Sequence, residues 1–416
     1  MDNITKVRGN IPSGSRGNIS SMPSIRDGGL KRVLGLSLGH FAVDFYMMLI
    51  PSIVPFLVLT LKLTQGQVGL IITAINLLSS SLQPVLGLVL DKRGNRKMVV
   101  YSLLWISIMM SAIAFTDSFI LIVVIATAAS LGSTLYHPLG AVIVNEHSGR
   151  KRGLYTSVYA ISGNLAAAVT PLVIVPMVNR FGALGIAYSV GIGIAAAVVM
   201  IYTRSAGAGD QAEYHGQPEG TRPAATCVDC KKNMVFLTLA EILRTWAFMV
   251  LTSFLSLYYV NMGYSEIAAS RIFTLFNTLA VLGLVLSGFM LSRHSSRKLL
   301  ILTGILSVVA YALFMMTSGA ASIVFIVAAG VCMRFSFTIA MVKGQELMPQ
   351  STGMVSGLMM GLTFGVGSVG AYITGIIADR IGLYNALYTQ IPVLVAATLL
   401  TLFFKPPKDI DLPNHI

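Results

Sequence analysis

Long apolar runs alternate with short polar segments along almost the whole chain after residue 30. Each run is about twenty residues long, which is the length that an α-helix needs to cross roughly 30 Å of hydrocarbon. Charged residues gather in the polar segments between the runs. The pattern predicts twelve membrane-spanning helices at 33–61, 67–90, 98–116, 119–146, 153–178, 182–203, 234–261, 266–291, 298–317, 321–345, 352–378 and 384–404.

Composition supports an all-α membrane protein. Of the 416 residues, 55% are hydrophobic and only 11% are charged, whereas soluble globular domains contain about 25% charged residues. The first thirty residues are polar and lack the apolar core and cleavage site of a signal peptide. We expect them to form a disordered tail, because they have too little apolar surface to fold.

The basic residues predict the orientation of the helices. Most of the 29 Lys and Arg residues lie in the two tails and in the loops on the same side, whereas Lys62, Arg180 and Arg380 lie on the other side. Loops rich in Lys and Arg stay in the cytoplasm, so both termini are expected to be cytoplasmic in a plasma membrane. The net charge of +13 therefore reflects topology, and no nucleic-acid partner is expected.

The chain contains a weak internal repeat. Three stretches recur in the same order about 200 residues later, the clearest being GLVLDKRGNRK (Gly87–Lys97) and GFMLSRHSSRK (Gly288–Lys298). Repeats of this kind are typical of transporters built from duplicated units. The predicted division is a tail at 1–30, a six-helix bundle at 31–203, a cytoplasmic linker at 204–233, a second six-helix bundle at 234–404 and a tail at 405–416.

The Gly87–Lys97 stretch resembles the loop signature of the major facilitator superfamily, G-x-x-x-D-(R/K)-x-G-(R/x)-(R/K)-(R/K), in its expected place between helices 2 and 3. The stretches GHFAVDFY, LYHPLGAVIV and GNLAAAVTP look like the fosmidomycin-resistance branch, whose members export an anionic phosphonate antibiotic in exchange for protons. The resemblance implies the twelve-helix major facilitator fold. It also implies a cytoplasmic gating cluster of Gly87, Asp91, Arg93, Gly94, Arg96, Lys97, Arg297 and Lys298.

Ionisable residues inside the predicted spans are functional candidates, because each costs about 2.5–3.5 kcal/mol at mid-membrane. They fall on helices 1, 4, 7 and 10, which line the central cavity in the superfamily: His40, Asp44, His137, Glu241, Arg244, Arg334 and Lys343. Lys343 lies near the inner helix end and is expected to pair with Glu346 or to reach the interface. The others are expected near the middle of the membrane.

The two halves carry different charges. His40, Asp44 and His137 in the first half suit proton loading, since histidine titrates near neutral pH and a carboxylate withdrawn from water can do so. Arg244 and Arg334 in the second half remain charged and offer planar donors for phosphonate or carboxylate. At 1.5 Å per residue, Asp44, Arg244 and Arg334 lie roughly 15 Å and His137 ~13 Å from the cytoplasmic helix ends, so the two sets are expected to converge. Glu241, Tyr46, Tyr136 and Trp246 are further substrate-site candidates, and Asn76, Asn164, Phe248 and Asn277 also lie on candidate pore faces.

Structural roles remain open for several of these residues. Glu241 and Arg244 are three residues apart and can neutralise each other. Asp44 can form a structural ion pair with Arg244 or Arg334 across the two halves. His40 can simply hydrogen-bond to Asp44 or to a backbone carbonyl.

The sequence favours a proton-coupled efflux antiporter for a small anionic or amphipathic compound of the fosmidomycin kind, in which two bundles rock about a central site. One alternative is a proton symporter that imports an organic anion, and another is a membrane receptor or scaffold without transport activity. The chain has no phosphate-binding loop, H-E-x-x-H motif or nucleophile elbow, so we expect neither an enzyme nor a bound cofactor. The expected partners are protons, a small molecule and the lipid bilayer, and the protein is expected to act as a monomer.

Overall fold

The computed structural model describes residues 28–93, 96–148, 152–205, 230–348, 355 and 358–405, and this part of the chain is helical without strands. The helices in chain order are α1 Gly28–Met47, α2 Leu49–Ser52, α3 Val54–Leu59, α4 Gln65–Arg93, α5 Met98–Ala112, the 3₁₀ turn η2 Ile113–Phe115, α6 Phe119–Ser148, α7 Arg152–Phe181, α8 Leu184–Tyr188, α9 Val190–Tyr202, α10 Cys230–Asn261, α11 Glu266–Leu291, α12 Ser296–Met316, α13 Gly319–Leu347, the π-helical turn η5 Leu358–Leu362, α15 Thr363–Ile381, α16 Leu383–Tyr388 and α17 Gln390–Leu402.

In their described residues, the twelve predicted spans each coincide with a helix or with a run of short helices, as the twelve-helix fold requires. Within the described residues, ten of these segments are long and apolar enough by length and composition to cross a membrane. The other two are α1 to α3 and α4. Residues 1–27 of the predicted first tail, most of the predicted linker 204–233 and residues 406–416 of the second tail lie outside the described residues, and α1 begins at Gly28, inside the predicted tail.

The first span is interrupted, whereas the sequence pattern predicted one continuous helix over 33–61. The regular α-helix is interrupted at Met48 and again at Ile53, between α1, α2 and α3, although the backbone N–H groups of Met48 and Ser52 still donate to the carbonyls four residues earlier. Pro51 has no N–H to donate to the carbonyl of Met47, which is the last residue of α1, and its ring clashes there. A proline four residues later, Pro55, stands at the start of α3. The apolar pattern does not show such breaks, because the segments remain apolar throughout.

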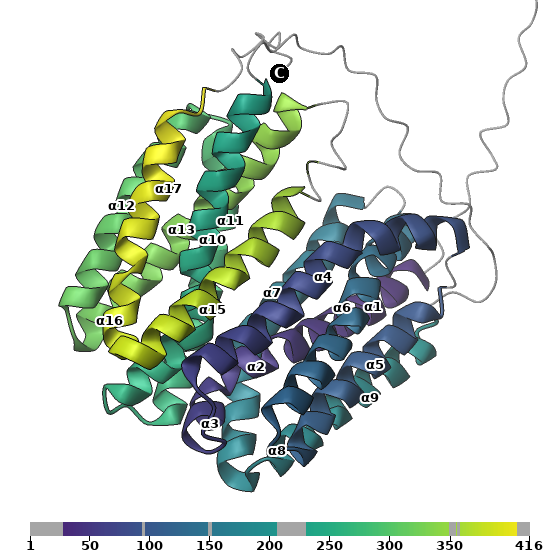
Figure 1. Ribbon diagram of the computed structural model, residues 1–416. Coiled ribbons are helices and arrows are strands. Elements are labelled where there is room, and N and C mark those ends of the chain that lie inside the picture. Colours follow the sequence, from purple (N-terminus) through teal and green to yellow (C-terminus); the bar gives the residue numbers. More distant parts are fainter. Residues whose placement is uncertain are drawn as a thin grey trace, which may run out of the picture.

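The helices lie in two groups, with α1 to α9 in one and α10 to α17 in the other (Figure 1). Because an even number of spans returns the chain to its starting side, α1 begins and α17 ends at the same end of the molecule. We call this the terminal end and the other the opposite end. The odd-numbered spans, including α1, α7 and α10, therefore run from the terminal end to the opposite end.

Close packing of α4 against α15 joins the two groups, and Figure 1 shows these helices side by side. At the opposite end, the Asp379 carboxylate accepts the backbone N–H groups of Gln65 (2.7 Å) and Gly66 (2.9 Å) at the start of α4. Glycines allow this approach, since a Cβ on Gly69 would lie 2.8 Å from the backbone of Tyr372. The contact places a negative charge at a helix N-terminus, where it is favourable.

A second contact between the groups involves α7 and α11. The Thr274 hydroxyl of α11 donates to the carbonyl of Ala168 on α7 at 3.0 Å. The α4–α15 pair has a similar bond near its middle, where Thr73 donates to the carbonyl of Ser368 at 2.5 Å. These hydroxyl bonds fix the register of the two groups without burying charge.

Candidate functional site

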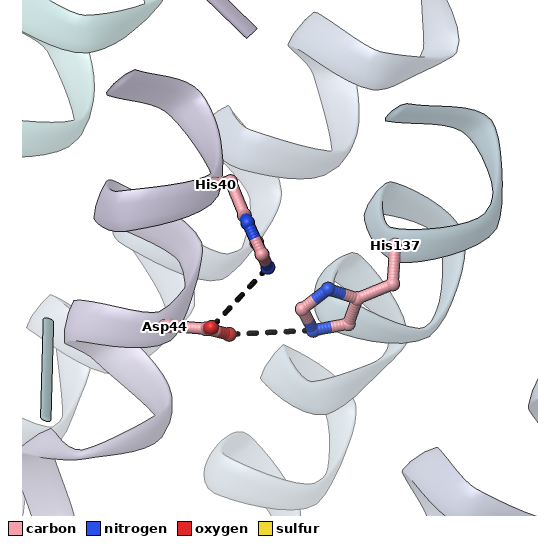
Figure 2. Close-up of side chains that lie close together, drawn as sticks. All are labelled: His40, Asp44 and His137. Carbon is pink, nitrogen blue, oxygen red and sulfur yellow. Dashed lines mark ion pairs between the residues drawn. The ribbon is translucent and has the colours of Figure 1, made fainter. Parts of the chain in front are cut away.

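Asp44 of α1 lies between two histidines. Its Oδ2 atom is 3.3 Å from Nε2 of His40, one turn earlier on α1, and its Oδ1 atom is 3.3 Å from Nε2 of His137 on α6. Figure 2 shows both imidazoles pointing toward the carboxylate from two helices. The ring centroids are 5.0 Å apart and the ring planes are nearly perpendicular, at 85°. One carboxylate is therefore shared by two imidazoles.

The His40 ring is held in one orientation by Tyr159 on α7. Its Nδ1 atom lies 2.7 Å from the Tyr159 carbonyl oxygen, and its ring stacks on the Tyr159 ring with 4.2 Å between centroids. A carbonyl oxygen can only accept, so Nδ1 of His40 carries the hydrogen of this bond. The Nε2 atom that faces Asp44 is consequently a lone pair or carries a second proton.

Gly163 of α7 has no side chain, and this leaves space for the side chains of His40 and Asp44. A Cβ at this position would lie 2.4 Å from Oδ2 of Asp44 and 2.6 Å from Cε1 of His40, well inside ordinary van der Waals contact. Gly163 begins the GNLAAAVTP stretch, so the small-residue segment of helix 5 packs directly on the charged residues of helix 1.

The cluster lies at the end of an uncovered stripe along α1. Leu34 is 50% exposed and Leu38 is 38% exposed, and the half-buried residues Phe41 and Asp44 continue the same helical face toward the middle of the span. The other faces of α1 pack on α5, α6, α7 and α9. The Asp44 and His137 side chains keep 24% and 29% of their surface exposed. The carboxylate is thus only partly covered by the surrounding helices.

Arg334 of α13 lies among three aromatic rings. Its guanidinium carbon is 5.2 Å from the ring centroid of Phe248 on α10, 5.7 Å from Phe337 on its own helix and 5.7 Å from Phe364 on α15. The side chain is half-buried, and within the described residues no hydrogen bond or ion pair joins it to an acceptor. Glu241 lies within electrostatic range. Arg334 therefore combines apolar walls with donors that remain available to a ligand.

Arg244 lies elsewhere, inside the second group of helices. It is 2% exposed, its Nη2 donates to the Thr401 hydroxyl of α17 at 2.7 Å, and its Nη1 is 3.6 Å from Oε2 of Glu241. The Glu241 carboxylate is equally buried and accepts a hydrogen bond from Ser336 of α13 at 3.0 Å. The two residues neutralise each other in the interior, which was one of the structural readings of the sequence.

The predicted convergence of Asp44 and Arg244 on one site is therefore wrong for this structure. The partly exposed face of α10 contains Val235, Leu239 and Leu243, and Arg244 is one residue further along the helix. One residue turns an α-helix by about 100°, which carries the guanidinium away from that face toward α12 and α17. Within the described residues, the ion-pair partners of Asp44 are histidines of its own group, so the cross-half ion pair is not present either.

Three aromatic residues predicted at the substrate site have packing roles here. Tyr46 and Tyr136 are fully buried and donate to the backbone carbonyls of Ser189 (2.5 Å) and Leu36 (2.7 Å). Trp246 of α10 is half-buried and donates to the Thr374 hydroxyl of α15 at 3.2 Å. The structure gives no support for a ligand contact by the two tyrosines, because their hydroxyl groups already have buried partners.

The predicted gating cluster is only partly within the described residues. Gly87, Asp91 and Arg93 belong to α4, and their side chains lie outside the described part, as does Gly94 entirely. Arg96 is half-buried and Lys97 is exposed just before α5, and both interact with other groups. In the second copy, Arg297 donates to the carbonyl of Leu402 at the end of α17 at 2.7 Å, and Lys298 is exposed. The gating role remains a prediction.

Sequence reasoning missed several residues that build these sites. Tyr159 orients His40, and Phe337 and Phe364 surround Arg334 together with Phe248. Phe337 is three residues after Arg334, a spacing that places both on one helix face, so this partner could have been found. Tyr159 and Phe364 could not, since their helices meet the charged residues only in three dimensions. The predicted Lys343–Glu346 pair is present, with 2.6 Å between Nζ and Oε2.

Comparison with known proteins gives a consistent family assignment. The family described as Major Facilitator Superfamily matches residues 36–369. The chain is 29% identical over 382 residues to the uncharacterized MFS-type transporter YfnC of Bacillus subtilis (strain 168), covering 90% of this chain and 92% of that protein. It is 26% identical over 387 residues to the fosmidomycin resistance protein of Escherichia coli (strain K12), covering 91% and 94%.

Solved transporter structures share the fold at lower identity. A bacterial homologue of the human lysosomal transporter Spinster, in an inward-facing and occupied conformation, has a TM-score of 0.74 at 15% identity, with 89% of this chain and 96% of that chain covered. The nucleoside transporter NupG has a TM-score of 0.70 at 14% identity, with 91% and 98% covered. At this identity the likeness shows the fold alone.

Proposed function

The chain belongs to the Major Facilitator Superfamily and is a membrane transporter rather than an enzyme, and from this premise we propose that it exports a small anionic or amphipathic compound in exchange for protons. The proton site is the cluster of His40, Asp44 and His137. The anion site is centred on Arg334. The terminal end of the molecule is the cytoplasmic end, as the distribution of Lys and Arg predicts.

The observation that carries the proposal is the shared carboxylate of Asp44. Because Nδ1 of His40 is committed to the Tyr159 carbonyl, a neutral His40 would point a lone pair at Oδ2 of Asp44 across 3.3 Å. Two acceptors at this distance repel each other unless a proton lies between them. Loading one proton turns the contact into a charge-assisted hydrogen bond, and releasing it restores the repulsion. The contact therefore favours a cycle of proton uptake and release.

The anion site is supported by the surroundings of Arg334. A guanidinium between phenyl rings keeps its planar donor edge, and the described residues do not use that edge for a hydrogen bond. The three rings of Phe248, Phe337 and Phe364 add apolar surface around the cation. Such a site suits a molecule with an anionic head and an apolar body. The resistance named in the Escherichia coli relative points to a phosphonate of the fosmidomycin kind and to export.

The test is transport by the purified protein in liposomes with an imposed pH gradient and fosmidomycin as substrate. The wild-type protein is expected to move fosmidomycin against the proton flux. Asp44→Asn is expected to abolish the pH-driven flux while fosmidomycin binding remains, because the anionic head of fosmidomycin binds Arg334 and not Asp44. Asp117→Asn, which changes an exposed aspartate outside the cluster, is the matched control.

A second variant pair addresses the anion site. Arg334→Ala is expected to weaken fosmidomycin binding by about 10- to 100-fold, the range for losing a hydrogen bond to a charged group at ~1.5–3 kcal/mol. The matched control is Arg293→Ala, since Arg293 stacks on Phe289 at 4.4 Å in an exposed position outside the site. Unchanged binding in Arg334→Ala overturns the anion site, and full pH-driven flux in Asp44→Asn overturns the proton site. Flux of fosmidomycin along the proton gradient would replace export with symport.

A further inference from the structure

We propose that His40, Asp44 and His137 also form a binding site for one divalent transition-metal ion such as Zn²⁺, Co²⁺ or Ni²⁺. One ligand atom from each of the three residues lies within 4.8 Å of the other two. Two imidazoles and one carboxylate form a donor set that suits these metals, whereas Mg²⁺ and Ca²⁺ prefer oxygen ligands alone. The inference concerns the same residues as the proton site but does not depend on transport.

The distances within the cluster match the edges of a coordination shell. With metal–ligand bonds of about 2.0–2.2 Å, neighbouring ligands of a tetrahedral ion are roughly 3.4 Å apart. The Asp44 oxygens are 3.3 Å from Nε2 of His40 and 3.3 Å from Nε2 of His137. The two contacts use different oxygens of Asp44, so a rotation of the carboxylate is needed to bring one oxygen to both nitrogens. The three ligand atoms already lie within 4.8 Å of one another.

The hydrogen bond of His40 prepares its Nε2 atom for a metal. Histidine ligands usually donate their other ring N–H to a carbonyl or carboxylate, which fixes the tautomer and the ring direction. His40 does this with the Tyr159 carbonyl at 2.7 Å and is further held by ring stacking. A bound cation also removes the repulsion between the Nε2 lone pair and the Asp44 carboxylate, as a proton does.

Access and open coordination positions follow from the exposure of the cluster. His137 and Asp44 keep 29% and 24% of their side-chain surface exposed, on the side where the uncovered stripe of α1 approaches. Three protein ligands leave at least one position of a tetrahedral ion open for water or an anion. A metal at this site therefore remains exchangeable, and it competes with protons because the ligands must be deprotonated to bind it.

His147 provides a matched control within the same helix. Like His40, it places Nδ1 at 2.8 Å from a backbone carbonyl, that of Ile143. Its Nε2 accepts a hydrogen bond from Arg32 at 2.8 Å instead of facing a carboxylate. The positively charged Arg32 disfavours a metal cation at this nitrogen, so His147 shares the carbonyl hydrogen bond of His40 but does not form a metal site.

The experiment measures metal binding by the full chain, purified in detergent with a tag that contains no histidine and stripped of metal by a chelator. Co²⁺ is expected to bind at one ion per chain with the visible ligand-field bands of a low-coordinate nitrogen–oxygen site, and Zn²⁺ is expected to displace it. Asp44→Asn and His137→Asn are each expected to weaken binding by at least tenfold, since even changes in outer-shell partners cost about 10- to 100-fold. His147→Asn is expected to bind Co²⁺ as the wild type does.

Several results would overturn the metal site. These are the absence of Co²⁺ bands, wild-type affinity in Asp44→Asn and His137→Asn, or displacement of Co²⁺ by equimolar Mg²⁺. Circular dichroism and the midpoint of thermal unfolding identify variants that fail to fold. If His137→Asn fails to fold, His137→Gln takes its place, and the Asp44→Asn result stands on its own. Metal binding without pH-driven transport leaves the metal site standing and removes the proposed function. The reverse result removes the metal site alone.

Discussion

Replacing Gly163 with alanine perturbs the shared carboxylate without changing any charge. The added Cβ would lie 2.4 Å from Oδ2 of Asp44, 2.6 Å from Cε1 of His40 and 2.8 Å from its Nε2. His40 cannot move away freely, because its Nδ1 is bonded to the Tyr159 carbonyl and its ring stacks on the Tyr159 ring. We expect the Asp44 carboxylate and the α7 backbone to shift apart.

The size of the effect follows from the displacement. Ordinary contact needs about 3.4 Å or more, so the carboxylate must move by roughly 1 Å, and overpacking of this kind costs ~1–3 kcal/mol. The same movement breaks the 3.3 Å contact between Asp44 and His40. Because the cost opposes the proton-loaded arrangement, pH-driven transport is expected to fall by about 5- to 140-fold, since 1.4 kcal/mol corresponds to a factor of ten.

The assay is pH-driven flux in liposomes, together with fosmidomycin binding and Co²⁺ binding in detergent. Gly163→Ala is expected to lower the flux and the Co²⁺ affinity while fosmidomycin binding at Arg334 stays within twofold of the wild type. The matched control is Gly191→Ala, since a Cβ at this exposed helical glycine meets no atom within 4 Å. Wild-type flux and Co²⁺ affinity in Gly163→Ala would refute the reasoning, because the contact would then tolerate the displacement.

Three further predictions concern the rest of the structure. Asp379→Ala removes the acceptor of two backbone N–H groups at the start of α4, each worth about 1 kcal/mol; spin-label distances between the opposite ends of α4 and α15 are expected to broaden, and unchanged distances would contradict this. Arg244→Leu leaves the buried Glu241 without its counter-charge, at a cost of about 3–5 kcal/mol, so the midpoint of thermal unfolding is expected to fall and to recover in the double variant with Glu241→Leu. Lys343→Ala removes an ion pair to the exposed Glu346, worth about 0–1 kcal/mol, and a large fall in the midpoint would show that the pair does more than the geometry indicates.

The sequence predicted the helices well and the side-chain environments less well. Apolar runs determine where spans lie, because every backbone group in the membrane must be satisfied within a helix or a barrel. The direction in which a side chain points changes by about 100° with each residue of a helix. A repeat aligned only at an offset of about 200 residues is not precise enough to fix that direction. Arg244 was therefore assigned to the same site as Asp44, although the guanidinium packs against α12 and α17. His40, Asp44 and His137 do lie together, because the i, i+4 spacing fixes the first two on one face and the helix rise places His137 at a similar depth.

The two halves join corresponding helices through carboxylates that differ in exposure. In the first half, Asp44 of α1 contacts His137 of α6 with about a quarter of each side chain exposed. In the second half, Glu241 of α10 contacts Ser336 of α13, again joining the first and fourth helices of the group, but both residues are 2% exposed or less. A carboxylate that water can reach exchanges protons or metal ions, whereas one sealed beside an arginine is fixed by the cost of separating the pair. The duplicated fold therefore provides one polar contact between the first and fourth helices of each half, and exposure distinguishes the contact of the first half, to which we assign the proposed proton site.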